Sequence, residues 1–132
     1  MNSLHDNFHG AGESTTDLSH GIVRGKIPGG VAILWHKKLD SVISVVRLES
    51  ECCIGIQIKC YNKEFIILNI YTPYESRHND NCVNRLAFIS SFISDQQCTS
   101  MYVDGDWNAD ISDNASCCHK HMVRFSNDNI DY

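Results

Sequence analysis

The feature that most constrains the fold is the segment from residue 52 to residue 71, where two strand patterns follow one another. In the first part apolar residues alternate with small or polar ones, and the apolar positions are Cys52, Ile54, Ile56, Ile58 and Cys60. Successive side chains of a strand point to opposite faces of a sheet, so this alternation predicts a half-buried strand. Residues 61–63 suit a tight turn, and Glu64–Tyr71 is then apolar almost throughout, as in a strand that is covered on both faces.

Two more segments of strand length precede this centre. Val31–Trp35 is a continuous apolar run after Pro28-Gly29-Gly30, and Val42–Leu48 follows the break at Asp40. Together with the two segments above, they predict an antiparallel meander of about four strands from residue 31 to residue 72.

The period becomes helical after Pro73. Apolar residues recur three or four positions apart at Cys82, Leu86, Ile89 and Ile93, which predicts an amphipathic helix. Ser100–Val103 is expected to be a short buried strand. A second amphipathic helix is expected from Ser116 to about Asn127, with Cys118, Met122 and Phe125 on one side.

The order of these elements indicates an α/β arrangement, in which helices pack on a sheet. Residues 1–28 are polar and rich in Gly, Ser, Thr and His, without a period of 2 or 3.6. We expect them to be an irregular N-terminal segment. Residues 29–132 are then the folded domain.

Composition excludes several classes of protein. The chain has 132 residues, of which 42% are hydrophobic, so a packed single domain is expected. The formal charge of −5 argues against a broad basic surface for nucleic acid. No apolar run approaches the roughly 18 residues of a membrane span. The N-terminus has no signal peptide pattern, so we expect an intracellular protein, nuclear or cytoplasmic and not secreted. The seven cysteines are expected to be free thiols without disulfide partners, mostly buried.

The segment Met101–Asp110 reads MYVDGDWNAD and ends a strand-like run in a cluster of acids. One reading is a turn that leads into a helix cap, because Asp, Asn and Gly are favoured in loops. A calcium loop is a poorer reading. Its sixth and twelfth positions would be Ala109 and Ala115, where such loops need Gly and Glu, and the preceding element is a strand.

A third reading is catalytic. A carboxylate at the carboxyl end of a buried strand can orient or deprotonate water, and a nearby Asn amide can donate to charge that develops on phosphorus. Oxygen-rich sites of this kind suit Mg²⁺ or Mn²⁺. Other chemistry has less support. Cys117, Cys118, His119 and His121 lack the paired spacing of a zinc site. Ser14 and Ser19 have no Asp/His framework for nucleophilic catalysis.

Three motifs in order resemble the endonuclease/exonuclease/phosphatase superfamily. The motifs are Gly29-Gly30-Val31-Ala32-Ile33-Leu34, Asn69-Ile70-Tyr71-Thr72-Pro73 and Gly105-Asp106-Trp107-Asn108. They are most similar to the endonuclease domain of LINE-type (non-LTR) retrotransposons, and the resemblance covers about residues 20 to 132. It implies a four-layer α/β sandwich, with two mainly antiparallel sheets packed together and helices outside. It also implies a Mg²⁺- or Mn²⁺-dependent hydrolase that nicks DNA.

The resemblance also implies roles for three residues. Asp106 would orient or activate the attacking water and so contact the metal indirectly, Asn108 would contact the scissile phosphate, and Tyr71 would place its hydroxyl near that phosphate. DNA would be the substrate, and a reverse transcriptase domain would be the partner in the parent polyprotein.

The sequence departs from the family pattern at both ends. The family's metal-binding Glu precedes the GGVAIL strand, and we do not assign Glu13 to that role. The family's closing Asp-His pair has no counterpart before Tyr132. We therefore expect a fragment of the domain that is inactive or weak alone. The alternative is a non-catalytic interaction domain or a translated relic of the same family.

Overall fold

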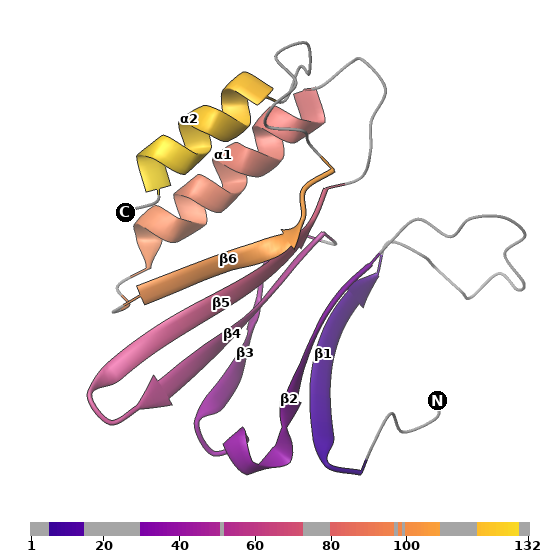
Figure 1. Ribbon diagram of the computed structural model, residues 1–132, viewed down its shortest axis with the longest axis vertical. Coiled ribbons are helices and arrows are strands. Elements are labelled where there is room, and N and C mark those ends of the chain that lie inside the picture. The colour runs from indigo at the N-terminus through magenta and orange to yellow at the C-terminus, as the bar shows by residue number, and fades with distance from the viewer. Residues whose placement is uncertain are drawn as a thin grey trace, which may run out of the picture. The chain divides into compact units, whose positions relative to one another are not determined.

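A computed structural model describes residues 6–14, 30–50, 52–72, 80–96, 98, 100–108 and 119–129 of the chain. This part of the chain is mixed α/β and holds two sheets and two α-helices (Figure 1). The strands are β1 (Phe8–Ser14), β2 (Gly30–His36), β3 (Ile43–Arg47), β4 (Cys53–Cys60), β5 (Lys63–Tyr71) and β6 (Ser100–Asp106). The helices are α1 (Asp80–Asp95) and α2 (His119–Asn129).

The chain divides into two compact units. The first consists of Met1–Tyr71 and Cys98–Asp106, and its described part contains all six strands. The second consists of Thr72–Gln97 and Trp107–Tyr132, and its described part contains α1 and α2.

The larger sheet of the first unit has the strand order β3-β4-β5-β6 (Figure 1). The three strands β3, β4 and β5 pair antiparallel, which confirms that part of the predicted meander. Strand β6 pairs with β5 in parallel, because the chain passes through α1 between them. Ile54, Ile66 and Leu68 are fully buried in this sheet, as the apolar patterns of β4 and β5 predict.

The smaller sheet corrects the predicted meander. Strand β2 pairs antiparallel with β1, with Ala11 opposite Ile33, and in the described residues it has no pairing with β3. Strand β1 lies within the segment 1–28 that was expected to be irregular. Its sequence FHGAGES has little apolar character, so the backbone ladder to β2 and a few side-chain contacts hold it rather than its own burial. The rest of residues 1–28 is outside the described residues, apart from Asp6 and Asn7.

The two sheets of the first unit contact each other through β1, β2, β4 and β5. Arg47 on β3 forms an ion pair with Glu13 on β1. The side-chain amide of Asn69 on β5 donates to the carbonyl oxygen of Ala32 on β2 at 2.9 Å. Val31 is buried on the inner side of β2, so the space between the sheets combines apolar packing with polar ties.

The second unit packs two helices side by side (Figure 1). Leu86 and Ile89 are buried on α1, and Met122 and Phe125 are buried on α2. These are positions that the helical periodicity predicted to be apolar and buried. The predicted Cys118 lies outside the described residues.

The side chain of Trp35 is half-buried, and its indole N–H donates to the exposed carboxylate of Asp40. One further expectation needs correction: the thiol of Cys60 is exposed, although the cysteines were expected to be mostly buried. In the described residues Cys52, Cys53, Cys60 and Cys98 all carry free thiols. None of the described helices is long and apolar enough to span a membrane.

Candidate active site

The centre of the candidate site is a pair of residues at the carboxyl ends of two neighbouring strands. Tyr71 is the last residue of β5, Asp106 is the last residue of β6, and the two are register partners. Neighbouring strands of a sheet lie about 4.8 Å apart. Asp106 is exposed and Tyr71 is half-buried. The pairing therefore brings together two of the three predicted catalytic residues at the carboxyl edge of the sheet.

The predicted acidic loop begins later than expected. Strand β6 does not end at Val103 but continues through Asp104, Gly105 and Asp106. All three pair with β5, opposite Asn69, Ile70 and Tyr71 respectively. The ladder to β5 holds these residues in the strand despite their low strand propensity.

Gly105 is the residue that allows this pairing. Its φ angle is +140°, a conformation that side-chain-bearing residues rarely adopt. A Cβ atom at this position would collide with the backbone carbonyl of Ile70 on β5. The carboxylate oxygen Oδ1 of Asp104 accepts a hydrogen bond from the Gly105 N–H at 2.8 Å. Glycine is therefore needed at position 105 of the motif Gly105-Asp106-Trp107-Asn108, because β6 approaches β5 closely just before Asp106.

Asn108, the third predicted catalytic residue, belongs to the second unit. Its φ angle is +45°, in the left-handed region that Asn tolerates. Its side-chain Nδ2 donates to the carbonyl oxygen of Thr72 at 2.8 Å. Trp107, the residue before Asn108, has its ring centroid 5.8 Å from that of Phe125, so its indole packs against α2. The side chain of Asn108 therefore joins two backbone segments of the second unit.

A divalent cation would need more ligands than the described residues of the candidate site provide. The candidate site contributes the carboxylates of Asp104 and Asp106, both on β6. Within the described ranges no group of three or more His, Cys, Asp or Glu side chains is arranged to hold a metal ion. These residues do not make up a Mg²⁺ or Mn²⁺ centre by themselves, and further ligands would have to come from outside them. Asp110 lies outside the described residues.

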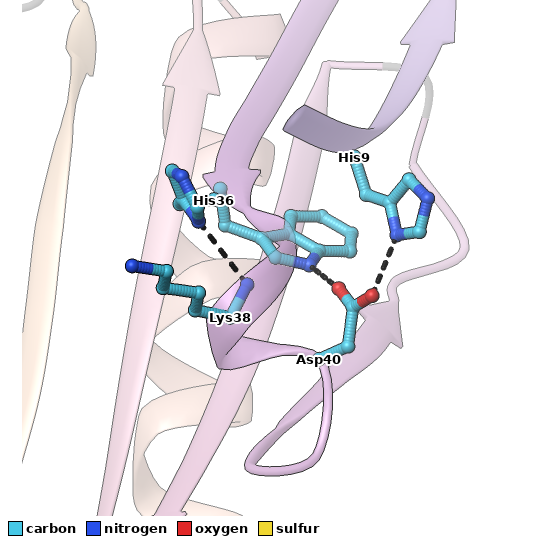
Figure 2. A network of polar contacts seen from close by, with 5 residues as sticks. His9, His36, Lys38 and Asp40 are labelled. Carbon is cyan, nitrogen blue, oxygen red and sulfur yellow. Dashed lines mark hydrogen bonds and ion pairs between the residues drawn. The ribbon is translucent and has the colours of Figure 1, made fainter. Parts of the chain in front are cut away.

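A His-Asp pair exists elsewhere in the first unit. The Nδ1 atom of His9 lies 2.9 Å from Oδ2 of Asp40, and Oδ1 of the same carboxylate accepts the Trp35 indole N–H at 2.8 Å (Figure 2). The hydrogen bond from Trp35 is the main cause that lowers the pKa of Asp40, and the hydrogen bond and charge of His9 act in the same direction.

This His-Asp pair does not belong to the candidate site. Asp40 follows the short 3₁₀ helix Lys37–Leu39 at the end of β2, where the Lys38 N–H donates to Nδ1 of His36 (Figure 2). Strands β5 and β6 end at the opposite end of the unit (Figure 1). The pair therefore cannot take the place of the closing Asp-His pair of the family pattern.

Sequence reasoning missed three residues around the site. Gly105 and Asn69 both lie within the quoted motifs. The motifs do not indicate that Gly105 allows a close approach of two strands, or that Asn69 joins the two sheets. Thr72 was not singled out, and it receives the hydrogen bond of Asn108 through its backbone. No side-chain signal at Thr72 would have identified it.

Comparison of the sequence with protein-family models and with curated proteins gives no match.

Proposed function

We propose that this chain carries the water- and phosphate-facing corner of a divalent-metal-dependent phosphodiesterase, of the type that nicks DNA for LINE-type retrotransposons. The observation that supports the proposal is the register pairing of Tyr71 with Asp106 at the carboxyl edge of β5 and β6. Three motifs in the order of that family, quoted above, support it independently. The proposed full fold is the family's four-layer sandwich, of which the two contacting sheets would form the inner layers.

The two paired side chains have complementary chemistry toward a phosphodiester. The exposed carboxylate of Asp106 can accept a proton or a hydrogen bond from water and so orient it for attack. The phenol of Tyr71 can donate its O–H to a phosphate oxygen. From the family motif, Asn108 is proposed as a neutral amide donor to phosphate. Asp106 would orient the water, and Tyr71 would bind the group that it attacks.

Mg²⁺ or Mn²⁺ belongs to the proposal as the cation that neutralises phosphate charge when it is bound. Because the described residues provide too few ligands for it, we expect the chain alone to cleave only slowly. DNA is the proposed substrate, and a reverse transcriptase domain is the proposed partner in a parent polyprotein.

A plasmid-nicking assay tests this function. Supercoiled plasmid is incubated with the chain and Mg²⁺, and the open-circular product is followed for wild type, Asp106→Asn and Tyr71→Phe. We expect slow nicking, and we expect its rate to fall at least about tenfold in Asp106→Asn. Catalytic groups that act as a unit depend on one another, so the loss of one carboxylate should remove most of the activity. Glu49→Gln is the matched control, because Glu49 is exposed in a turn of the same unit.

Each outcome has a clear meaning. Nicking that Asp106→Asn leaves unchanged would show that another site, or a contaminant, cleaves the DNA. The absence of nicking in the wild-type chain would favour the alternative of a non-catalytic interaction domain or relic.

A further inference from the structure

The hairpin that joins β4 to β5 carries a residue that its turn does not favour. Cys60 and Lys63 are register partners, so the turn consists of Tyr61 and Asn62. The φ angle of Tyr61 is +55°, in the left-handed region that is unfavourable for a bulky side chain. Two-residue turns with a positive φ at this position normally take Asn, Asp or Gly. Turn formation therefore does not explain the tyrosine at position 61.

Burial does not explain this tyrosine either. Its side chain is completely exposed, so the aromatic ring gains nothing from the core of the first unit. Residues that are held in an unfavourable backbone conformation cluster at binding and active sites. The ring of Tyr61 is thus a fully accessible aromatic surface at the end of a hairpin, and it is retained at a cost to the turn.

Two lysines flank the turn. Lys59 precedes it, with a side chain that is 63% exposed, and Lys63 follows it and is exposed as well. Lys59 is the register partner of Glu64, and its ammonium nitrogen lies 3.7 Å from the carboxylate of that residue. Successive residues of a strand point to opposite faces, so the side chains of the two lysines leave the hairpin on opposite faces. A positive charge therefore lies on each side of Tyr61.

Further lysines lie at the same end of the first unit. The 3₁₀ helix that follows β2 contributes two of them, and the chain then passes to Val42, whose carbonyl oxygen accepts the Lys59 N–H at 2.9 Å. Figure 1 shows the end of β2, the start of β3 and the β4–β5 hairpin at one end of this unit. All the lysines that the structure describes in the first unit are found here: Lys37, Lys38, Lys59 and Lys63.

The acids of this end are Asp6, Asp40 and Glu64. The carboxylate of Asp40 accepts the indole N–H of Trp35, and the carboxylate of Glu64 accepts a hydrogen bond from Gln57. Two of the three acids thus already have donors within the chain. The formal charge of −5 argues against a broad basic surface, but it allows a small basic site of this size.

We propose that the hairpin tip, residues 59–63, is a binding site for single-stranded nucleic acid: a base stacks on the ring of Tyr61, and the neighbouring phosphates pair with Lys59 and Lys63. Proteins bind single strands by combining aromatic rings, on which bases stack, with positive charges that follow the backbone. Every base has a flat face, so this site is not expected to select a sequence. In a duplex the bases stack on one another, so their faces are not accessible to the ring.

The hairpin tip is remote from the candidate active site. Strand β5 has 9 residues, and Tyr71 is the last of them, so the turn lies about 26 Å from Tyr71 at a rise of about 3.3 Å for each residue. A nucleotide that is bound at the tip is therefore not the phosphodiester that Tyr71 and Asp106 would contact. The inference goes beyond the proposed function and does not depend on it.

The test measures binding without cleavage. A fluorescein-labelled oligothymidylate of about 12 nucleotides, within the usual site size for single strands, is titrated with the full chain in the presence of EDTA, and its fluorescence anisotropy is followed. We expect a Kd of about 10⁻⁵ M at about 50 mM salt. Tyr61→Asn should weaken binding at least about fivefold, whereas Tyr61→Trp should stay within about twofold of wild type, because tryptophan keeps the stacking surface.

The choice of asparagine separates binding from folding. Asn tolerates a positive φ, so Tyr61→Asn should unfold at the same urea concentration as wild type or at a higher one. Its loss of affinity then cannot come from unfolding. Tyr102→Asn is the matched control, because Tyr102 is also an exposed tyrosine of the first unit but shares its face of β6 with Asp104. We expect this control to bind the oligonucleotide as wild type does.

The lysines have a readout of their own. Each phosphate that a lysine neutralises contributes about 0.7 to the slope of the logarithm of affinity against the logarithm of salt concentration. Lys59→Gln and Lys63→Gln should each lower this slope by about that amount. An unchanged slope in both variants would contradict their place in the site.

Three other results would overturn the proposal. The first is no binding by the wild-type chain at about 10⁻⁴ M protein. The second is equal affinity for the single strand and for a duplex of the same length, because phosphate attraction alone would then explain binding. The third is an equal effect of Tyr61→Asn and Tyr102→Asn. Because EDTA excludes metal-dependent cleavage, a failure of the nicking assay leaves this test unaffected.

Discussion

Trp35 donates its indole N–H to the carboxylate of Asp40 at 2.8 Å, across the 3₁₀ turn that follows β2. The same carboxylate meets His9 of β1, so one exposed acid joins the two strands of the smaller sheet at one end (Figure 2). This contact has a measurable pH dependence.

The Trp35 hydrogen bond lowers the pKa of Asp40 in the folded chain below its ordinary value. A group whose pKa is depressed by folding stabilises the fold at pH values above its unfolded pKa, about 4, and this contribution is lost as the pH falls through the folded pKa. In a Trp107→Phe background the fluorescence of Trp35 should therefore change on acidification below about pH 4.

The control for this prediction is Asp128→Asn, whose wild-type residue pairs with Arg124 in α2. That variant should retain the fluorescence step, whereas Asp40→Asn should abolish it. A step that survives in Asp40→Asn would show that another carboxyl group causes it.

Gly105→Ala should destabilise the first unit strongly. The new methyl group would meet the backbone of Ile70, and the φ angle of +140° is unfavourable for alanine. We expect a loss of at least about 2 kcal/mol of unfolding free energy, measured by urea denaturation. Gly12→Ala is the matched control, because the nearest atom to its new methyl group would be the Val31 carbonyl oxygen at 3.1 Å, which a small shift relieves. Equal effects of the two substitutions would contradict the close approach of β6 to β5.

Leu68→Ala should create a cavity in the larger sheet. Leu68 is completely buried, so we expect a loss of about 2–5 kcal/mol of unfolding free energy. Leu34→Ala removes the same atoms from a side chain that is 58% exposed, and its effect should stay within about 0.5 kcal/mol. Similar urea midpoints for both variants would mean that the face of β5 with Leu68 is not packed.

The cysteines should differ in reactivity along a single strand. Burial raises the pKa of the Cys53 thiol to about 11, with a further contribution from Cys52. The thiolate is the reactive form, so Cys53 should react with a maleimide only slowly at pH 8, whereas the exposed Cys60 should react first. Peptide mapping of the labelled chain checks the order. Because the pKa is raised, labelling of Cys53 should increase as the pH approaches 11, and equal labelling at pH 8 would contradict its burial.

Strands β3, β4 and β5 of the larger sheet could be predicted from the sequence, because their apolar residues alternate or run continuously. Strand β6 was expected to be short and buried, but it extends to Asp106 and none of its residues is buried. Strand β1 could not be predicted, because Gly10 and Gly12 leave it without an alternation of apolar and polar residues. Its pairing with β2 is also a contact between residues far apart in the sequence. The same limit explains why β2 was assigned to the wrong sheet. Periodicity identifies strands, but it does not identify their partners.

For the candidate site the motifs identified Tyr71, Asp106 and Asn108, but not their relationship. Only the register of β5 and β6 brings Tyr71 opposite Asp106. The roles of Gly105 and Asn69 depend on how closely one backbone approaches another, which no spacing of residue types encodes. The metal remained a prediction, because the described carboxylates are too few to form a cation centre.

The parallel pairing of β6 with β5 has a consequence for the order in which the chain folds. Strands β3, β4 and β5 are joined by short turns and can pair as soon as they meet, but β6 returns only after the whole of α1. Long-range pairs form slowly because closing a large loop costs entropy before any contact is gained. The Tyr71–Asp106 corner should therefore be the last part of the sheet to assemble during refolding. A chain still emerging from the ribosome could already pair β3, β4 and β5, with the edge of β5 unpaired. Tyr71 and Asp106 would come together only when β6, the last strand, has paired with β5.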